Sequence, residues 1–181
     1  MKKLFTDSRE PRLETDALQH IEFSLEVDET QKGQTKGIVA TVLVKNHNDD
    51  EVAVLNPFET MQFLLVDTEG APVDLPKKAP NLLINRKGKN WEWDVVFPVI
   101  GYFENGREVD ASKIKNEILT LPGNGSLTAQ FSINRMIDSG EETPIPSGKY
   151  AIQALTPLIN ADNRSESRAL ESPRITVEYS K

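Results

Sequence analysis

Two histidines and no cysteine limit the chemistry that this chain of 181 residues can perform. Acid–base catalysis relies most often on histidine, and a cysteine nucleophile or a cysteine-based zinc site is excluded. His20 begins an alternating apolar run, where the edge of a strand is the simpler interpretation. His47 stands among Asn46, Asn48, Asp49 and Asp50, which suggests a cation loop but lacks the glycine that an EF-hand loop requires. We interpret this loop as a solvated turn and predict no metal and no cofactor.

Motifs for nucleophilic and phosphate chemistry are also missing from the sequence. Gly123-Asn124-Gly125-Ser126 and Ser147-Gly148 do not form the nucleophile elbow of a serine hydrolase, and both are explained as turns that precede strands. No glycine-rich phosphate loop is present. Glu92 and Asp94 share one face of an expected strand, so paired carboxylates acting on a glycosidic bond stay a minor alternative. We therefore predict that the protein is not an enzyme.

Trp91 and Trp93 are the first candidate for a binding surface. Their i, i+2 spacing directs both rings to the same face of a strand. Exposed rings would form a stacking platform for sugar rings or for the side chains of a partner. Buried rings, which are the commoner case for large aromatic residues, would seal their segment against the core. A carbohydrate-binding module is therefore an alternative function.

The polar connection between Pro157 and Pro173 is the second candidate. Loops longer than roughly 12–15 residues are usually functional or disordered. We expect this loop at the same end of the fold as residues 46–51, because sandwich loops cluster at the two ends. A solvated excursion without a binding role is the alternative. The residues that we single out in these two loops are Asn48, Asp49, Arg164 and Arg168.

Alternating apolar residues predict the strands that position these loops. The expected strands cover residues 21–27, 37–46, 52–55, 61–66, 71–75, 91–100, 118–121, 126–134, 149–155 and 174–179. The second of these is apolar on both faces, which favours a central place in its sheet. Residues 126–134 and 149–155 both follow Pro/Gly turns, and we expect them to be adjacent antiparallel strands separated by an exposed loop at residues 141–146.

Residues 77–116 break this rhythm and are interpreted as a β-rich insertion. Within them, Asn105-Gly106 is a strong two-residue hairpin signal, and Asp110 is placed to cap a helical turn carrying Ile114 and Ile118. Residues 1–17 are charged, lack periodicity and are expected to form an N-terminal arm. The sequence thus predicts one all-β domain over residues 18–181: an immunoglobulin-like antiparallel β-sandwich with an insertion and at most one short helix.

Charge and hydropathy narrow the expected partners. The chain carries 21 Lys and Arg against 28 Asp and Glu, a net charge of −7, and no stripe of basic residues of the kind that binds nucleic acid. Its apolar runs fall far short of the roughly 20 residues that span a bilayer. Lys2 and Lys3 are not followed by the apolar region of a signal peptide. Together with the lack of cysteine, this favours the cytoplasm unless a leader was removed.

Four segments resemble the bacterial intracellular proteinase inhibitor type of immunoglobulin-like domain. They are Val42-Leu43-Val44-Lys45-Asn46, residues 61–66 followed by Asp67-Thr68-Glu69-Gly70, Leu119-Thr120-Leu121-Pro122-Gly123, and Ser147-Gly148-Lys149-Tyr150. The resemblance implies a cytoplasmic, non-catalytic, protein-binding role and assigns no individual residue. We therefore expect a protein-binding module whose loops engage another protein, with a peptidase as one candidate. A structural subunit of an envelope or phage-like assembly is a further alternative.

Overall fold

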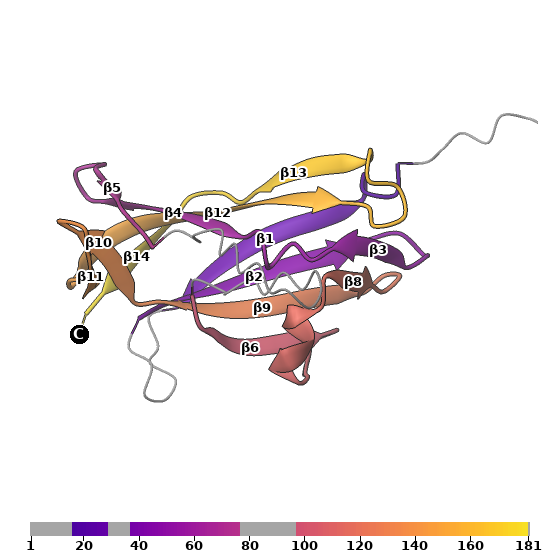
Figure 1. Ribbon diagram of the computed structural model, residues 1–181, viewed down its shortest axis with the longest axis horizontal. Coiled ribbons are helices and arrows are strands. Elements are labelled where there is room, and N and C mark those ends of the chain that lie inside the picture. Colours follow the sequence, from indigo (N-terminus) through magenta and orange to yellow (C-terminus); the bar gives the residue numbers. More distant parts are fainter. Residues whose placement is uncertain (1–15, 29–36, 77–96, 181) are drawn as a thin grey trace, which may run out of the picture.

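Two antiparallel sheets of five strands each face one another in the computed structural model, which describes residues 16–28, 37–76 and 97–180 (Figure 1). This arrangement confirms the predicted all-β antiparallel sandwich. The first sheet has the strand order β1-β2-β9-β6-β7. Its strands are β1 (Ile21–Asp28), β2 (Ile38–Asn46), β9 (Ser126–Ile133), β6 (Val99–Glu104) and β7 (Arg107–Glu108).

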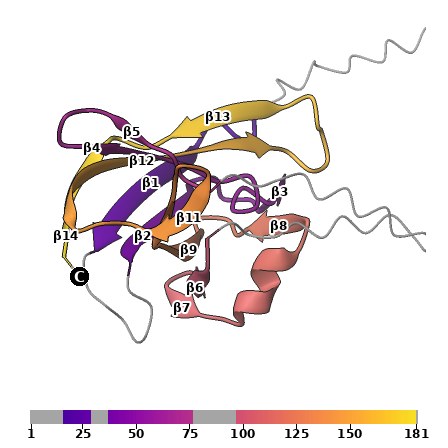
Figure 2. The ribbon, with the colours of Figure 1, turned by 60° about the vertical axis from the view of Figure 1, so that its left-hand side comes forward.

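The second sheet is organised around its longest strand, β12 (Gly148–Ile159). One edge of β12 pairs with β14 (Ile175–Tyr179) over its first half and with β13 (Ser167–Glu171) over its second half. The other edge pairs with β4 (Gln62–Asp67), which is followed by the short β5 (Pro72–Val73). Figure 2 shows β4 and β5 in one layer and β6 and β7 at the edge of the other. β5 lies at the edge of this sheet.

Two separate two-stranded pairs and one helical turn complete the described part of the chain. β3 (Val52–Leu55) pairs with β8 (Ile118–Leu121), and β10 (Arg135–Asp138) pairs with β11 (Glu141–Pro144). A 3₁₀ turn, η1 (Ala111–Lys115), is capped by Asp110, whose carboxylate accepts a hydrogen bond from the Ser112 amide. The predicted cap is confirmed. The turn ends before Ile118, which lies on β8 with 47% of its surface exposed.

The core lies between the inner faces of the two sheets. Period-2 alternation places every second side chain of β2 in this core, where Ile38, Ala40, Val42 and Val44 are all fully buried. The outward Val39 is buried as well, which explains why β2 is apolar on both faces. As predicted, β2 is central, with β1 on one side and β9 on the other.

β9 and β12 correct a prediction about strand pairing. The two strands were expected to be adjacent, but β9 pairs with β2 and β6 whereas β12 belongs to the facing sheet. The loop expected between them is instead the β10–β11 hairpin, whose tight turn is formed by Ser139 (φ 52°) and Gly140 (φ 87°). Similar turn sequences at the two strands carried no information about which sheet each strand joins.

The connection predicted between Pro157 and Pro173 is not a long loop. β12 continues to Ile159, and β13 runs back from Ser167, so only residues 160–166 form the turn. Pro157 fits this strand because its nitrogen faces away from β13. Main-chain groups alternate in direction along β12, and the Asn160 amide donates to the Glu166 carbonyl across the hairpin. The nitrogen of Pro157 therefore points to the opposite edge of β12, where pairing with β4 stops at Leu155.

The region predicted as an insertion contributes directly to the first sheet. β6 pairs with β9, and β7 folds back on β6 through Asn105 and Gly106, both at positive φ (50° and 75°). This confirms the two-residue hairpin. The expected strand start at Trp91, together with Trp93, Glu92 and Asp94, lies outside the described residues, as does most of the N-terminal arm.

Candidate functional site

Four connecting segments meet at one end of the sandwich, which we call the loop end: residues 16–20, 46–51, 122–125 and 160–166. Main-chain hydrogen bonds already join them. The Asn124 amide donates to the Asn48 carbonyl, and the Ala161 amide donates to the Ala53 carbonyl at the start of the neighbouring strand. A Cβ atom at Gly123 would overlap the Asp49 carbonyl, so these loops touch closely. The two loops predicted from sequence therefore lie at the same end, as expected.

Asn48 and Asp49 use their side chains to hold this arrangement. The Asn48 side-chain amide donates to the Ala17 carbonyl (2.9 Å). The Asp49 carboxylate accepts from the side-chain amide of Asn124, also at 2.9 Å. Each residue thus links residues 46–51 to another segment of the loop end.

Asn46, the last residue of β2, holds the same loop in place and was not among the residues singled out from the sequence. It is fully buried. Its side-chain amide donates to the carbonyls of Asp50 (2.9 Å) and Leu121 (3.4 Å), and its Oδ1 accepts from the Asn48 amide. The signal was present in the sequence, because an asparagine at the end of a strand commonly bonds to the main chain two residues later.

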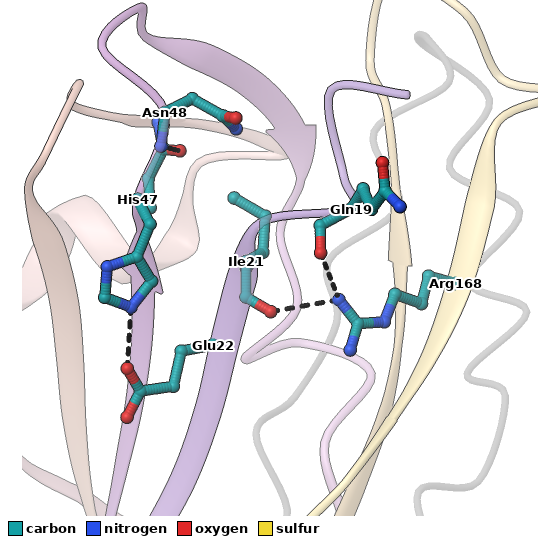
Figure 3. Close-up of polar contacts among 7 residues, drawn as sticks. Gln19, Ile21, Glu22, His47, Asn48 and Arg168 are labelled. Carbon is teal, nitrogen blue, oxygen red and sulfur yellow. Dashed lines mark hydrogen bonds and ion pairs between the residues drawn. The ribbon is translucent and has the colours of Figure 1, made fainter. Parts of the chain in front are cut away.

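Arg168 lies on β13 and binds the start of β1 rather than projecting from a loop (Figure 3). Its Nη1 atom donates to the carbonyl oxygens of Leu18 (3.2 Å), Gln19 (3.2 Å) and Ile21 (3.0 Å). Figure 3 also shows His47, whose Nε2 atom lies 2.7 Å from a Glu22 carboxylate oxygen in an exposed pair. Neither arrangement converges on a cavity.

Glu166 completes the attachment of the segment that leads into β1. One carboxylate oxygen accepts from the Leu18 amide (3.1 Å), and the other accepts from the side chain of the buried Asn160 (2.7 Å). By contrast, Arg164 at the tip of the same turn is exposed, 3.8 Å from the exposed Glu117. Of the four loop residues predicted for binding, Asp49, Arg164 and Arg168 are exposed and Asn48 is half-buried.

The described residues also form an apolar groove that sequence reasoning missed. We call it the β4 groove. It has a volume of about 860 Å³ and is lined by residues 58–66 and 72–76 with Phe97, Phe131 and Arg174. Most of its lining belongs to β4, β5 and the segment that precedes β4, and Phe131 comes from β9 of the facing sheet. Most of its wall comes from residues 58–76, but Phe97, Phe131 and Arg174 come from distant parts of the chain, so the alternation along β4 alone gave no signal for it.

Three phenylalanine rings form the floor of the β4 groove. The ring of Phe63 meets the rings of Phe97 and Phe131 edge to face, with centroids 5.8 Å and 5.4 Å apart. A fourth ring, Phe58, packs in the same manner on Tyr102 at 6.0 Å. Such offset or edge-to-face pairs are the favoured aromatic geometry. The polar side chains on the rim include Glu59, Asp74 and Arg174.

The titratable groups with shifted pKa values have structural explanations. Burial, followed by the nearby charge of Glu104, raises the pKa of Tyr102 to about 12. Burial also raises the pKa of Tyr150, whose hydroxyl donates to the Pro146 carbonyl at 2.7 Å. Hydrogen bonds from Ser112 lower the pKa of Asp110 at its cap. In the part of the chain that the structure describes, no three or more acidic, His or Cys side chains are grouped to hold a metal ion.

The described residues include no helix of the length and apolar character needed to cross a membrane.

The fold defines the class of the protein as an all-β antiparallel sandwich, and the comparisons with known proteins add no family. No family model and no curated protein matches the sequence. Structural genomics target SoR45 is 8% identical over 89% of this chain and 88% of that chain, with a TM-score of 0.44. BslA, described as a bacterial hydrophobin, is 14% identical over 89% and 95% of the two chains, with a TM-score of 0.30.

A third similar structure is the yeast delta-COP-I mu-homology domain complexed with a Dsl1 WxWxV peptide. It is 11% identical over 91% of this chain and 59% of that chain, with a TM-score of 0.27. At these TM-scores the likenesses carry no inference about function.

Proposed function

We propose that this protein is a non-catalytic protein-binding module and that the β4 groove is its binding surface. The observation that carries the proposal is the groove itself, with about 860 Å³ of volume, a floor of phenylalanine rings and a polar rim. Binding sites in proteins are typically concave and mostly apolar, with a few polar groups that fix orientation. The groove has each of these properties.

The loop end fits a binding role less well than the sequence analysis expected. Asn48, Asp49 and Arg168 already bond to the chain's own groups. A partner that used these side chains would have to break those bonds, which offsets much of the gain because each group must again be satisfied. Asp49, Arg164 and Arg168 are exposed, but exposed charges contribute little affinity. We therefore place the binding surface at the groove and not at the loops.

The kind of partner is suggested by the resemblance to intracellular proteinase inhibitors, which makes a peptidase one candidate. The carbohydrate-binding alternative depends on Trp91 and Trp93, which lie outside the described residues, and it stays a prediction. The structural-subunit alternative predicts that the groove binds further copies of this chain. These three alternatives differ in the molecule that should be found next to β4.

Site-specific photo-crosslinking tests the proposal with a matched control. Leu64 borders the groove and Ile118 lies on β8, and their exposed fractions are nearly equal at 48% and 47%. Each is replaced separately by p-benzoylphenylalanine, and the protein is irradiated in a lysate of its source organism. We expect one defined adduct with another protein from position 64 and none from position 118. The adduct should disappear when an excess of the unlabelled chain competes.

Two results would contradict the proposal. Identical adducts at both positions would mean that the probe reports general exposure and not a binding surface. Adducts formed only between copies of this chain would favour the structural-subunit alternative. Mass spectrometry identifies the protein crosslinked at position 64. It therefore distinguishes these outcomes and shows whether the partner is a peptidase.

A further inference from the structure

We propose that Asn105 is a site of spontaneous deamidation, at which the main-chain nitrogen of Gly106 attacks the side-chain carbonyl of Asn105 and ammonia is released. The sequence contains two Asn-Gly pairs, Asn105-Gly106 and Asn124-Gly125. The first pair is placed to react, whereas hydrogen bonds and packing hold the second. This modification site lies in the β6–β7 hairpin and does not depend on the binding function proposed above.

An Asn-Gly pair offers little steric resistance to this reaction. Glycine has no side chain, so its main-chain nitrogen can approach the carbonyl carbon, Cγ, of the preceding asparagine. A bond forms between this nitrogen and Cγ, the bond from Cγ to the side-chain nitrogen breaks, and the main-chain amide proton leaves with the departing ammonia. One water molecule then opens the five-membered imide, which gives aspartate or isoaspartate. The sequence of steps consumes no oxidant or reductant.

The main-chain nitrogen of Gly106 is accessible as the nucleophile. Asn105 and Gly106 are both exposed at the tip of the hairpin. Within the described ranges, the Gly106 amide donates no hydrogen bond. A Cβ atom built at Gly106 would meet no other atom within 4 Å. The peptide unit between the two residues therefore has room to turn toward the Asn105 side chain.

The side-chain carbonyl of Asn105 is activated by the start of β9. The Ser126 amide donates to Asn105 Oδ1 at 2.8 Å, and the Asn105 amide donates to the Ser126 carbonyl, also at 2.8 Å. Attack at Cγ places negative charge on Oδ1, and a main-chain donor that already points at this oxygen stabilises such a charge. The Ser126 amide therefore favours the reaction while it holds the side chain in place.

The main-chain nitrogen of the second pair is already engaged. The Gly125 amide donates to the Pro122 carbonyl at 3.0 Å, so this bond must break before the nitrogen can attack. Gly125 is also buried, and a Cβ atom there would clash with Asn105 Oδ1 and with the Pro122 ring. The peptide unit between Asn124 and Gly125 therefore has little room to turn.

The side chain of Asn124 is held as well, by a carboxylate. Its nitrogen, which would be the leaving group, donates to Asp49 Oδ1 at 2.9 Å. The negative charge of Asp49 also opposes the charge that attack would place on the Asn124 carbonyl oxygen. Both asparagines have nearly the same φ, 50° at Asn105 and 51° at Asn124. The difference between the pairs therefore arises from hydrogen bonds and packing and not from this backbone angle.

The two products would affect the hairpin differently. Isoaspartate carries the main chain through the former side chain, which adds one methylene to the two-residue turn between Glu104 and Arg107. Aspartate keeps the length of the turn and adds a negative charge next to Glu104. We therefore expect isoaspartate at position 105 to disturb the pairing of β7 with β6, and aspartate to preserve it.

The test is incubation of the full chain in mildly alkaline buffer, followed by digestion and mass spectrometry. The masses of the peptides that contain positions 105 and 124 report deamidation, and a protein isoaspartyl methyltransferase labels the isoaspartate. In the folded chain, Asn105 should react at least about tenfold faster than Asn124, because Asn124-Gly125 must first lose two hydrogen bonds. In urea that unfolds the chain, the two rates should converge.

Two substitutions provide matched controls. Asp49→Ala removes the acceptor of the Asn124 side chain, so it should speed deamidation at Asn124 and leave the rate at Asn105 unchanged. Asn105→Gln should remove the fast reaction, because its longer side chain would have to close a six-membered ring, and the slow reaction at Asn124 should persist. Urea unfolding of each variant verifies that it is folded during the incubation.

Three results would overturn the proposal. Equal rates at the two positions in the folded chain would mean that the contacts of Asn124 and Gly125 give no protection. Reaction at Asn105 in urea only would mean that the folded hairpin protects this residue. A difference in rate that persists unchanged in urea would assign the selectivity to the flanking residues and not to the fold.

Discussion

The loop end and the β4 groove differ in how their main-chain groups are satisfied. At the loop end, the side chains of Asn46, Asn160 and Arg168 bond to the amides or carbonyls of neighbouring segments. At the groove, the edge of β4 at Phe63 has no strand partner among the described residues, and aromatic rings form the surface below it. The polar residues at the loop end therefore support the fold, and the β4 groove is where we propose that binding occurs.

We expect the largest effect on the free energy of unfolding from a substitution in the floor of the β4 groove. Phe63→Ala should lower the free energy of unfolding by about 4 kcal/mol, because a buried aromatic side chain is lost together with its contacts to Phe97 and Phe131. Phe63→Leu, which keeps most of the apolar volume, should cost about 1.5 kcal/mol. Urea unfolding measures both. A cost below about 1 kcal/mol for Phe63→Ala would mean that the floor is not part of the core.

The loop end should be nearly as sensitive, but at a polar residue. Asn46→Ala leaves the Asn48 amide and the carbonyls of Asp50 and Leu121 without this partner. We expect a loss of about 3 kcal/mol, since unsatisfied buried groups cost more than a hydrogen bond contributes. Asn48→Ala, at a half-buried position, should cost about 1 kcal/mol. Equal, small effects in urea unfolding would contradict the supporting role of Asn46.

Unfolding at alkaline pH tests whether the buried Tyr102 phenol is shielded from water. Burial raises the pKa of Tyr102 to about 12 from 10.0, so the folded state holds this proton to higher pH than the unfolded chain does. The stabilisation by the neutral phenol is full below pH 10 and is lost as pH rises toward 12, by about 2 kcal/mol. Tyr102→Phe should show a correspondingly smaller decline in urea unfolding between pH 9 and pH 12. An equal decline in both proteins would mean that Tyr102 is hydrated.

Arg168 and Arg164, in the β12–β13 hairpin, distinguish a side chain that supports the loop end from one that is only exposed. Arg168→Ala should cost about 2 kcal/mol, because three carbonyls near the start of β1 lose a charged donor. Arg164→Ala should change stability by less than about 0.5 kcal/mol, since its pair with Glu117 is long and exposed. Thermal unfolding of the two variants under the same conditions provides the comparison. Similar losses from both would show that Arg168 is no more than a surface charge.

Local periodicity predicted most strands but not their partners. Alternation along β1 and β4 depends on neighbours two residues apart, so it could be recognised in the sequence. The separation of β9 and β12 into different sheets depends on contacts between distant residues, and similar turns before both strands suggested the wrong pairing. Pro157 was read as the start of a loop because the direction of its nitrogen is known only once its strand has been placed.

The candidate site shows the same limit more strongly. Asn48, Asp49 and Arg168 were chosen because polar residues in loops are accessible, yet their hydrogen-bond partners lie in other segments. Phe63, Phe97 and Phe131 appear in the sequence as ordinary core residues. They form a groove because β4, β5 and β9 meet at one side of the sandwich. Residue type alone therefore assigned binding to the polar loops and support to the aromatic rings, the reverse of what we propose.

The smallest expected effect on stability is also the sharpest test of the comparison. Leu64 and Ile118 have nearly the same exposure, 48% and 47%, so replacing either by Asp should change the free energy of unfolding by no more than about 0.5 kcal/mol. Stability then cannot distinguish the two positions, and any difference in binding must arise from where they lie. Equal unfolding midpoints in urea, together with binding lost only in Leu64→Asp, would locate recognition at β4. A large loss of stability at Leu64 would instead show that this side chain belongs to the core, and its effect on binding would then be indirect.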